Sequence, residues 1–199
     1  AWLSLDAADN DPSRFWLHVT AAVRNAVTED ESSDLGAANA GAGAGGDVVV
    51  ALVNELAQLD DDVTLVFDDY HVIEATPIHE AVTFLIEHLP PCARIVIGTR
   101  ADPPLPLARL RARGDLAEIR AADLRFTTAE ADTYLNDSMT LGLSNGDIER
   151  LDTRTEGWIA ALQLAALSLQ GRDDSAAFID TFSGDDRFVV DYLVEEVLD

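Results

Sequence analysis

The sequence contains no lysine, and this absence narrows the kinds of partner that the protein can bind. All 13 basic residues are arginines, against 37 acidic residues, so the formal net charge is −24. Such an acidic chain repels phosphate backbones and anionic headgroups, which excludes a sequence-independent grip on DNA or on a membrane. The densest basic stretch is "RLRARG" (109–114), and we interpret its arginines as a solvated helix face.

Cysteine is almost absent as well. Cys92 is the only one, which excludes a disulfide framework and fits a reducing compartment, so we expect a cytoplasmic protein. The chain begins "AWLSLD", without an initiating Met or the regions of a signal peptide, and it has no apolar run of about 18 residues. We therefore expect no membrane partner, and we interpret the chain as a piece of a longer protein.

The absence of lysine also excludes a complete P-loop. That phosphate-binding motif, G-x-x-x-x-G-K-[ST], requires a lysine followed by a hydroxyl residue. The glycine-rich stretch "GAANAGAGAGG" (36–46) has neither, and it follows acidic residues rather than a strand. We predict instead that residues 29–46 form a flexible insert.

An alternation of strand and helix patterns occupies the first part of the chain. Apolar runs typical of strands occur at 2–5, 63–67, 94–100 and, more weakly, 116–119. The run at 63–67 is continuous, which predicts a strand covered on both faces. Helical spacing separates the runs, over about 11–27, 48–59, 76–88 and 105–113. The alternation predicts an α/β fold with a parallel sheet over residues 1–122.

The rest of the chain shows helical patterns alone. They cover 128–136, 145–154, 157–170, 174–182 and 186–198. We predict a helical subdomain over 123–172 and the opening helices of a winged-helix-like domain over 173–199. The last helix pattern is amphipathic, and we expect it to pack poorly in this chain, because the partners that it would meet lie further along a longer protein.

Polar residues stand at the ends of the first three predicted strands: Asp6, then Asp68 with Asp69, then Thr99 with Arg100. In open parallel sheets the ligand crevice lies outside the carboxyl ends of the strands. Adjacent carboxylates repel each other, and a Mg²⁺ ion with phosphate oxygens would account for the pair, with arginine meeting the phosphate charge. The alternative is that these aspartates are ordinary turn and N-cap residues.

The histidines offer weaker patterns. "HEAVTFLIEH" (79–88) predicts no zinc site, because the motif H-E-x-x-H would need histidine where Thr83 stands. His71 follows the acidic pair closely enough to touch a ligand, although packing together with Tyr70 is an equal alternative.

Five segments carry a resemblance to a known family. They are "AWLSLDAADNDPSRFW", "LVFDDYHVI", "IVIGTRADPPLPLARLRARGDLAEIRAADLRFTTAEA", "TEGWIAALQLAALSL" and "FVVDYLVEEVLD". In this order they resemble the MalT-like ATP-dependent regulators of the LuxR type, which belong to the STAND class of signal-transducing P-loop NTPases. The resemblance implies ATP or ADP with Mg²⁺ as cofactors, and a switch that couples nucleotide binding and slow hydrolysis to regulation.

The resemblance also implies roles for individual residues. "LVFDD" resembles the Walker B strand, so Asp68 is the expected Mg²⁺ partner and Asp69 the residue that polarises the attacking water. "GTR" resembles the sensor segment, which places Thr99 in the nucleotide site and Arg100 near the γ-phosphate. "TEGW" resembles the helix start that contacts the nucleotide from the helical subdomain, through Gly157 and Trp158. This chain departs from the family pattern in having Ile159 where many members carry proline.

In the family the Walker A strand and loop lie just upstream of the segment that matches "AWLSLD". We therefore expect this chain alone to be inactive, with an unpaired sheet edge that invites self-association or a partner strand. The expected partners are a nucleotide and the sensor and DNA-binding domains further along the parent, without direct nucleic-acid contact by this segment. Two alternatives are a catalytically inactive NTPase-fold interaction module and a regulatory region fused to a Ser/Thr kinase.

Overall fold

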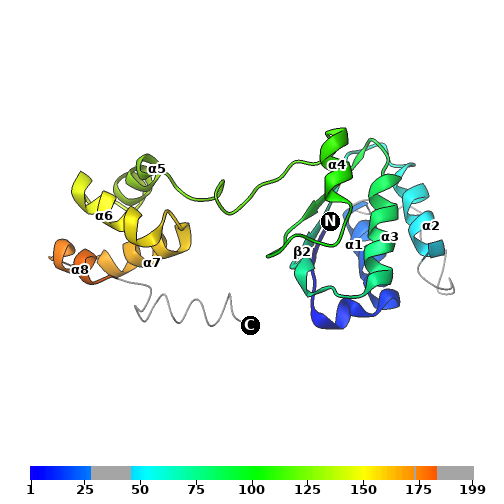
Figure 1. The fold of residues 1–199 in the computed structure, drawn as a ribbon, viewed down its shortest axis with the longest axis horizontal. Coiled ribbons are helices and arrows are strands. Elements are labelled where there is room, and N and C mark those ends of the chain that lie inside the picture. Colours follow the sequence, from blue (N-terminus) through cyan, green and yellow to red (C-terminus); the bar gives the residue numbers. More distant parts are fainter. Residues whose placement is uncertain (28–45, 173, 183–199) are drawn as a thin grey trace. The chain divides into compact units, whose positions relative to one another are not determined.

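The structure is a computed structural model that describes residues 1–27, 46–172 and 174–182. It divides into two compact units, Ala1–Leu116 (unit 1) and Ala117–Asp199 (unit 2), whose elements are labelled in Figure 1. The insert predicted over 29–46 lies outside the described residues except for its last glycine, and the helix predicted over 186–198 lies wholly outside them. The domain boundaries predicted from the sequence stay predictions.

Unit 1 is built on a parallel sheet. Its strands are β1 (Trp2–Ser4), β2 (Val63–Asp68) and β3 (Ala93–Ile97). They lie in the order β1-β2-β3, and both pairings are parallel, with Phe67 opposite Leu3 on one side and Ile97 on the other. The α/β fold class predicted from the alternation of strands and helices is therefore confirmed.

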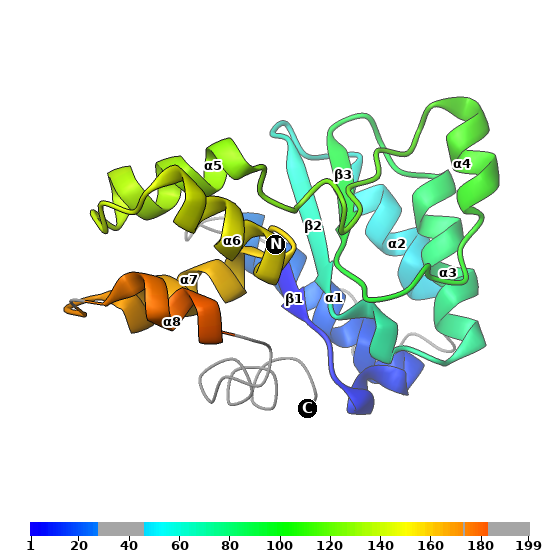
Figure 2. The ribbon, with the colours of Figure 1, turned by 60° about the vertical axis from the view of Figure 1, so that its left-hand side comes forward.

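Helices pack against one face of this sheet. The α-helices of unit 1 are α1 (Pro12–Val27), α2 (Gly46–Leu56), α3 (Thr76–Glu87) and α4 (Leu107–Arg113), and the short 3-10 turns are η1 (Ala7–Asn10) and η2 (Tyr70–Val72). Figure 2 shows α1, α2 and α3 beside the three strands. Buried apolar residues of α1, α2, α3 and the sheet form one core, which includes Phe15, Trp16, Leu52, Leu56, Leu65, Phe67, Ile78 and Leu85. Burial of these large side chains is the main stabilising term in unit 1.

The two faces of the sheet differ in burial. Leu65 and Phe67 of β2 are fully buried, whereas Thr64 is exposed and Val66 is half-buried. The register places Trp2, Val66 and Val96 in one row on this second face, where Trp2 is 67% and Val96 50% exposed. The prediction that β2 is covered on both faces is wrong for the described residues, because the helices of the core pack on the side of Leu65 and Phe67.

The fourth strand predicted at 116–119 is also wrong. In the part of the chain that the structure describes, these residues form no strand, and Ile119 is 74% exposed. Glu118 instead forms a local ion pair with Arg120, with 2.9 Å between their charged atoms. Four residues with only two large apolar side chains bury little surface, and a strand without a hydrogen-bonded neighbour gains no ladder to offset the cost of ordering it.

Unit 2 is helical, as predicted. Its elements are α5 (Thr128–Asp132), which runs into the π-helical turn η3 (Thr133–Ser138), then α6 (Asn145–Thr155), α7 (Ile159–Leu169) and α8 (Ser175–Thr181). Thr127 and Ser144 begin α5 and α6 with capping boxes, in which Glu130 and Asp147 bond back to the cap. The core of unit 2 gathers apolar residues from all of these helices, including Ala131, Leu135, Ile148, Leu151, Leu162, Ala165 and Ile179.

Candidate functional site

The carboxyl ends of the three strands meet at one edge of the sheet. The backbone N–H of Leu5 donates to the carbonyl of Asp68 (3.1 Å), and that of Gly98 donates to the carbonyl of Phe67 (2.8 Å). The N–H of Tyr70 in turn donates to the carbonyl of Gly98 (2.9 Å). Asp68 therefore ends the central strand and Asp69 follows it, with the residues after β1 and β3 on either side of this pair.

Asp68 is the last residue of β2 and is half-buried. One carboxylate oxygen, Oδ1, accepts a hydrogen bond from the backbone N–H of Asp69 (3.1 Å). A Cβ atom built on Gly98 would lie 2.6 Å from this oxygen, which is closer than any real contact allows. Gly98 therefore leaves the space that the Asp68 carboxylate occupies. The segment "GTR" begins with Gly98, and a glycine directly after a strand is the sequence signal for such a close approach.

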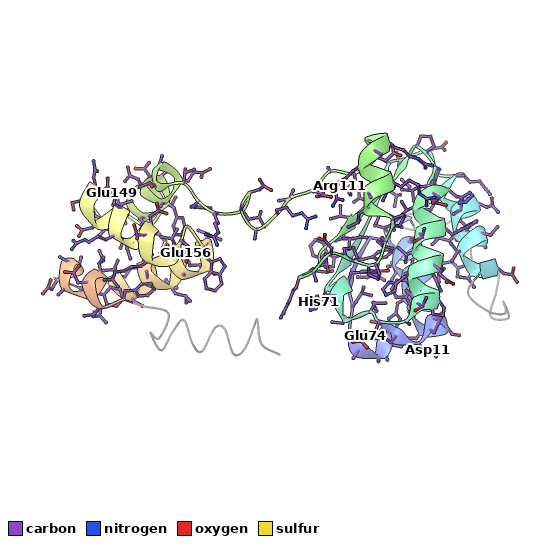
Figure 3. All side chains as sticks on the ribbon, viewed as in Figure 1. Asp11, His71, Glu74, Arg111, Glu149 and Glu156 are labelled. Atoms are coloured by element: carbon purple, nitrogen blue, oxygen red, sulfur yellow. The ribbon has the colours of Figure 1, made fainter. Side chains whose placement is uncertain are left out.

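Asp69 has a left-handed backbone, with φ 56° and ψ 33°. This conformation costs a residue other than glycine about 1 kcal/mol, and aspartate tolerates it better than most. Its side chain is 47% exposed, and His71 Nδ1 lies 3.8 Å from its Oδ1. Figure 3 shows His71 and Glu74 on the segment between β2 and α3. A water-exposed carboxylate thus stands next to the half-buried carboxylate of Asp68.

Asp6 has a structural task. Its Oδ1 accepts a hydrogen bond from Ala8 N (2.7 Å), so it caps η1, and its Oδ2 lies 3.3 Å from Arg14 Nη2. Asp9 completes the capping box and is buried, with Oδ1 3.1 Å from Arg14 Nε and 2.9 Å from His18 Nδ1. Burial raises the pKa of Asp9, but the hydrogen bonds from Asp6 and Arg14, together with the electrostatic effects of His18 and Arg14, hold that pKa below its ordinary value. For Asp6, the capping alternative is the one that the geometry supports.

Thr99 and Arg100 follow β3 and are both exposed. The Thr99 hydroxyl donates to the carbonyl of Ala101 (2.7 Å), which is a local turn contact. Arg100 occupies the loop that leads from β3 toward α4. The structure therefore places both residues beyond the strand end that neighbours the acidic pair.

Tyr70 and His79 form a buried polar pair behind the acidic residues. The Tyr70 hydroxyl lies 2.9 Å from His79 Nδ1, and the two residues are 1% and 8% exposed. Burial raises the pKa of Tyr70 far above its ordinary value, so the phenol stays protonated. Burial also lowers the pKa of His79, although a hydrogen bond with the backbone of Ile73 opposes this effect. Tyr70 is thus packed in the core, and His79 serves as its partner.

Asn10 ties the end of η1 to the segment that follows the acidic pair. Its side-chain oxygen accepts hydrogen bonds from the backbone N–H groups of Glu74 (2.7 Å) and Ala75 (3.1 Å). Its side-chain nitrogen donates to the carbonyls of Val72 (2.8 Å) and Ala7 (3.1 Å). No sequence signal points to this residue, because three of its four partners lie more than sixty positions away in the chain.

Gly157 and Trp158 belong to unit 2. Gly157 has φ 71°, and a Cβ at this position would collide with the carbonyl oxygen of Phe126. The carbonyl of Gly157 accepts a hydrogen bond from the Phe126 N–H (2.8 Å). Trp158 is the N-cap residue of α7 and is 37% exposed. The glycine is therefore required for the turn between α6 and α7, and the tryptophan begins the next helix with part of its ring accessible.

The residues at the edge of unit 1 fit a hydrated divalent cation. Mg²⁺ is usually held by one or two carboxylates together with water and phosphate oxygens, and Asp68 and Asp69 supply the carboxylates. No group of three or more His, Cys, Asp and Glu side chains among the described residues forms a complete protein cage for a metal. Among the same residues, no helix is long and apolar enough to cross a lipid bilayer.

The whole chain is similar to segments of two kinds of protein. It is 36% identical over 200 residues to the serine/threonine-protein kinase PknK of Mycobacterium tuberculosis (strain ATCC 25618 / H37Rv), with 100% of the chain and 18% of PknK covered. It is 36% identical over 201 residues to the HTH-type transcriptional regulator MalT of Yersinia enterocolitica, with 100% of the chain and 22% of MalT covered. MalT of Yersinia pestis (strain Pestoides F) matches at 36% over 206 residues, with the same coverage.

These matches confirm the resemblance to MalT-like proteins along the full chain. The chain spans only 18% to 22% of the length of the relatives, so its likeness is to one region of much longer proteins. No protein-family model matches the chain.

Proposed function

We propose that the chain is part of the nucleotide-binding switch module of a MalT-like, LuxR-type regulator of the STAND class. In this proposal ATP or ADP binds with Mg²⁺ at the carboxyl edge of the sheet, and binding and hydrolysis are coupled to signal-dependent regulation. One observation carries the proposal: adjacent carboxylates end the central strand of a parallel sheet, in a chain that resembles transcriptional regulators over its whole length.

Asp68 and Asp69 have different tasks in this proposal. The half-buried carboxylate of Asp68, which occupies the space left by the missing side chain of Gly98, binds Mg²⁺. The more exposed carboxylate of Asp69 orients and polarises the attacking water. The metal ion, when bound, neutralises charge on the phosphate oxygens.

The positive and apolar contributions come from other segments. Arg100 lies near the γ-phosphate and Thr99 lies beside it, so that ATP and ADP differ in their contact with the guanidinium. Gly157 and Trp158 contact the nucleotide from the helical subdomain. The phosphate cradle with its lysine is supplied by another part of the parent, because this chain has no lysine. The parent is cytoplasmic, and its sensor and DNA-binding domains are the partners of this module.

Three substitutions in the intact parent test the proposal. Asp68→Asn weakens binding of the Mg²⁺ nucleotide, and Asp69→Asn slows hydrolysis while binding is largely kept. Arg100→Ala reduces the discrimination between ATP and ADP, since an arginine near the γ-phosphate separates them by charge. Calorimetry with each nucleotide and a phosphate-release assay measure these effects. If nucleotide affinities and hydrolysis rates stay unchanged in all three variants, these residues are ordinary polar residues at strand ends and form no nucleotide site.

A second candidate function is a regulatory region attached to a Ser/Thr kinase. The match to PknK favours it, because PknK is as similar to this chain as MalT is. A third candidate function is that of a protein-interaction module, which has the NTPase fold but does not hydrolyse ATP. The parent sequence separates these readings: a kinase domain in the parent identifies the second, and a parent without G-x-x-x-x-G-K-[ST] after an apolar strand upstream of Ala1 identifies the third.

A further inference from the structure

Tyr70, the residue after the acidic pair, is anchored from three elements. Its ring is buried and stacks on Phe67 of β2, with 6.4 Å between the ring centroids. Its hydroxyl bonds to His79 of α3 (2.9 Å), and its backbone N–H donates to Gly98 after β3 (2.9 Å). Tyr70 therefore has a position that neither its backbone nor its side chain can leave without losing contacts.

The residue on the other side of Asp69 is anchored as well. Asp68 is paired within β2, and its carbonyl accepts the Leu5 N–H (3.1 Å). Asp69 is thus the single link between two fixed residues. Its backbone has a positive φ, which residues other than glycine rarely adopt. Such a conformation persists only where the surrounding contacts enforce it.

Asn10 closes the other end of the same segment. Through Val72, Glu74 and Ala75 it holds the backbone that leads into α3, the helix that carries His79. The segment from 70 to 75 is therefore fixed at both ends. Asp69, which connects this segment to β2, must adopt the backbone conformation that joins the two.

We propose that Tyr70, through its hydrogen bond to His79, is a positioning residue that keeps Asp69 in the left-handed conformation and so sets the direction of its carboxylate relative to that of Asp68. The consequence for Mg²⁺ rests on the proposed function, whereas the conformational effect does not. His79 suits this task because its ring is buried beside the phenol, and Nδ1 accepts the phenol hydrogen when Nε2 carries the ring proton.

Nuclear magnetic resonance of the ¹⁵N-labelled chain tests the positioning directly. A strong NOE between the amide and Hα protons of Asp69 reports its positive φ. We expect this NOE to weaken in Tyr70→Phe and in His79→Leu, which both remove the hydrogen bond. The NOE should stay strong in two control variants. His79→Asn keeps an acceptor near the position of Nδ1, and Tyr134→Phe removes a hydroxyl from unit 2 instead. An undiminished NOE in both Tyr70→Phe and His79→Leu overturns the proposal.

The functional consequence is measured on the same samples with Mn²⁺ as the probe. In the wild-type chain, Mn²⁺ should broaden the amide signals of Asp69 and Gly98. The concentration that gives half of the broadening rises about fivefold in Tyr70→Phe and His79→Leu, because one hydrogen bond is worth roughly that factor. It changes less than about twofold in the two controls. A wild-type chain without this broadening overturns the proposed cation site, while the NOE still decides whether Tyr70 positions Asp69.

Discussion

Gly98 is a residue whose lack of a side chain makes room for a carboxylate. In Gly98→Ala the new methyl group would meet Asp68 Oδ1 at 2.6 Å, so the carboxylate or the strand end must move. We expect a loss of about 1–3 kcal/mol in the free energy of unfolding, the usual effect of overpacking. Urea denaturation of the chain measures it.

The control for this prediction is Gly146→Ala in α6. The nearest atom to a Cβ at that position is Ser144 Oγ at 3.9 Å, so there is room for a methyl group. Alanine is the better helix former, and this variant should gain about 0.5–1 kcal/mol. Equal effects of the two substitutions would show that the Asp68 carboxylate moves aside freely.

Tyr70 makes stability depend on pH in the alkaline range. Its folded-state pKa is raised by burial, so above the ordinary tyrosine pKa of 10.0 the unfolded chain loses a proton that the folded chain keeps. The stabilisation is therefore complete below pH 10 and falls as the pH rises above it, by up to about 1.4 kcal/mol per pH unit. Denaturation at pH 8 and pH 11 should show a larger loss in the wild type than in Tyr70→Phe. Equal losses would mean that the phenol ionises freely in the folded protein.

At the scale of elements, Asn10 joins η1 to the segment between β2 and α3. Asn10→Ala removes hydrogen bonds to four backbone groups, those of Ala7, Val72, Glu74 and Ala75. We expect a loss of about 2–3 kcal/mol, because several polar groups lose their partner at once. Asn54→Ala on an exposed position of α2 is the matched control and should change stability by less than about 0.5 kcal/mol. Thermal unfolding monitored by circular dichroism compares the two, and similar melting temperatures would contradict the prediction.

The elements that could be predicted from the sequence are those whose signal is local. The apolar run of β2 and the Pro12 start of α1 are readable from a few neighbouring residues, and the structure has both. The strand at 116–119 could not be judged in this way, because a strand depends on the edge that it pairs with. Whether one or both faces of a sheet are buried likewise depends on which helices pack there. The apolar run of β2 does not contain this information, and the alternation of buried and half-buried residues along the strand appears only in the folded structure.

The candidate site was predictable in composition but not in geometry. The position of Asp68 and Asp69 at the end of an apolar run indicates them as candidates, whereas the positive φ of Asp69 and the space beside Gly98 arise from contacts between different strands. Asp6 illustrates the opposite case: its position resembled that of the acidic pair, and only the contacts with Ala8 and Arg14 identify it as a cap.

At the scale of the whole molecule, the net charge determines how the chain interacts with a nucleotide. The chain carries a net charge of −24 and no lysine, so a nucleotide polyanion is repelled unless Mg²⁺ intervenes. We expect this 199-residue chain to bind MgATP weakly and to release no phosphate, since preorganised donors supply most of the stabilisation in phosphoryl transfer. Calorimetry and a phosphate-release assay test this. A micromolar dissociation constant with sustained turnover would show that the cradle is formed by arginines and backbone groups of this chain.

The face of the sheet that carries the row of Trp2, Val66 and Val96 contains a natural fluorescent reporter, the indole of Trp2. The three tryptophans differ in exposure, with Trp2 at 67%, Trp158 at 37% and Trp16 at 2%. A neutral collisional quencher such as acrylamide therefore reaches the indole of Trp2 most readily, and Trp2→Phe removes the most quenchable part of the emission. Any part of a longer chain, or any second molecule, that settles on this face shields Trp2 and lowers the quenched fraction, so coverage of the sheet can be followed in solution by fluorescence.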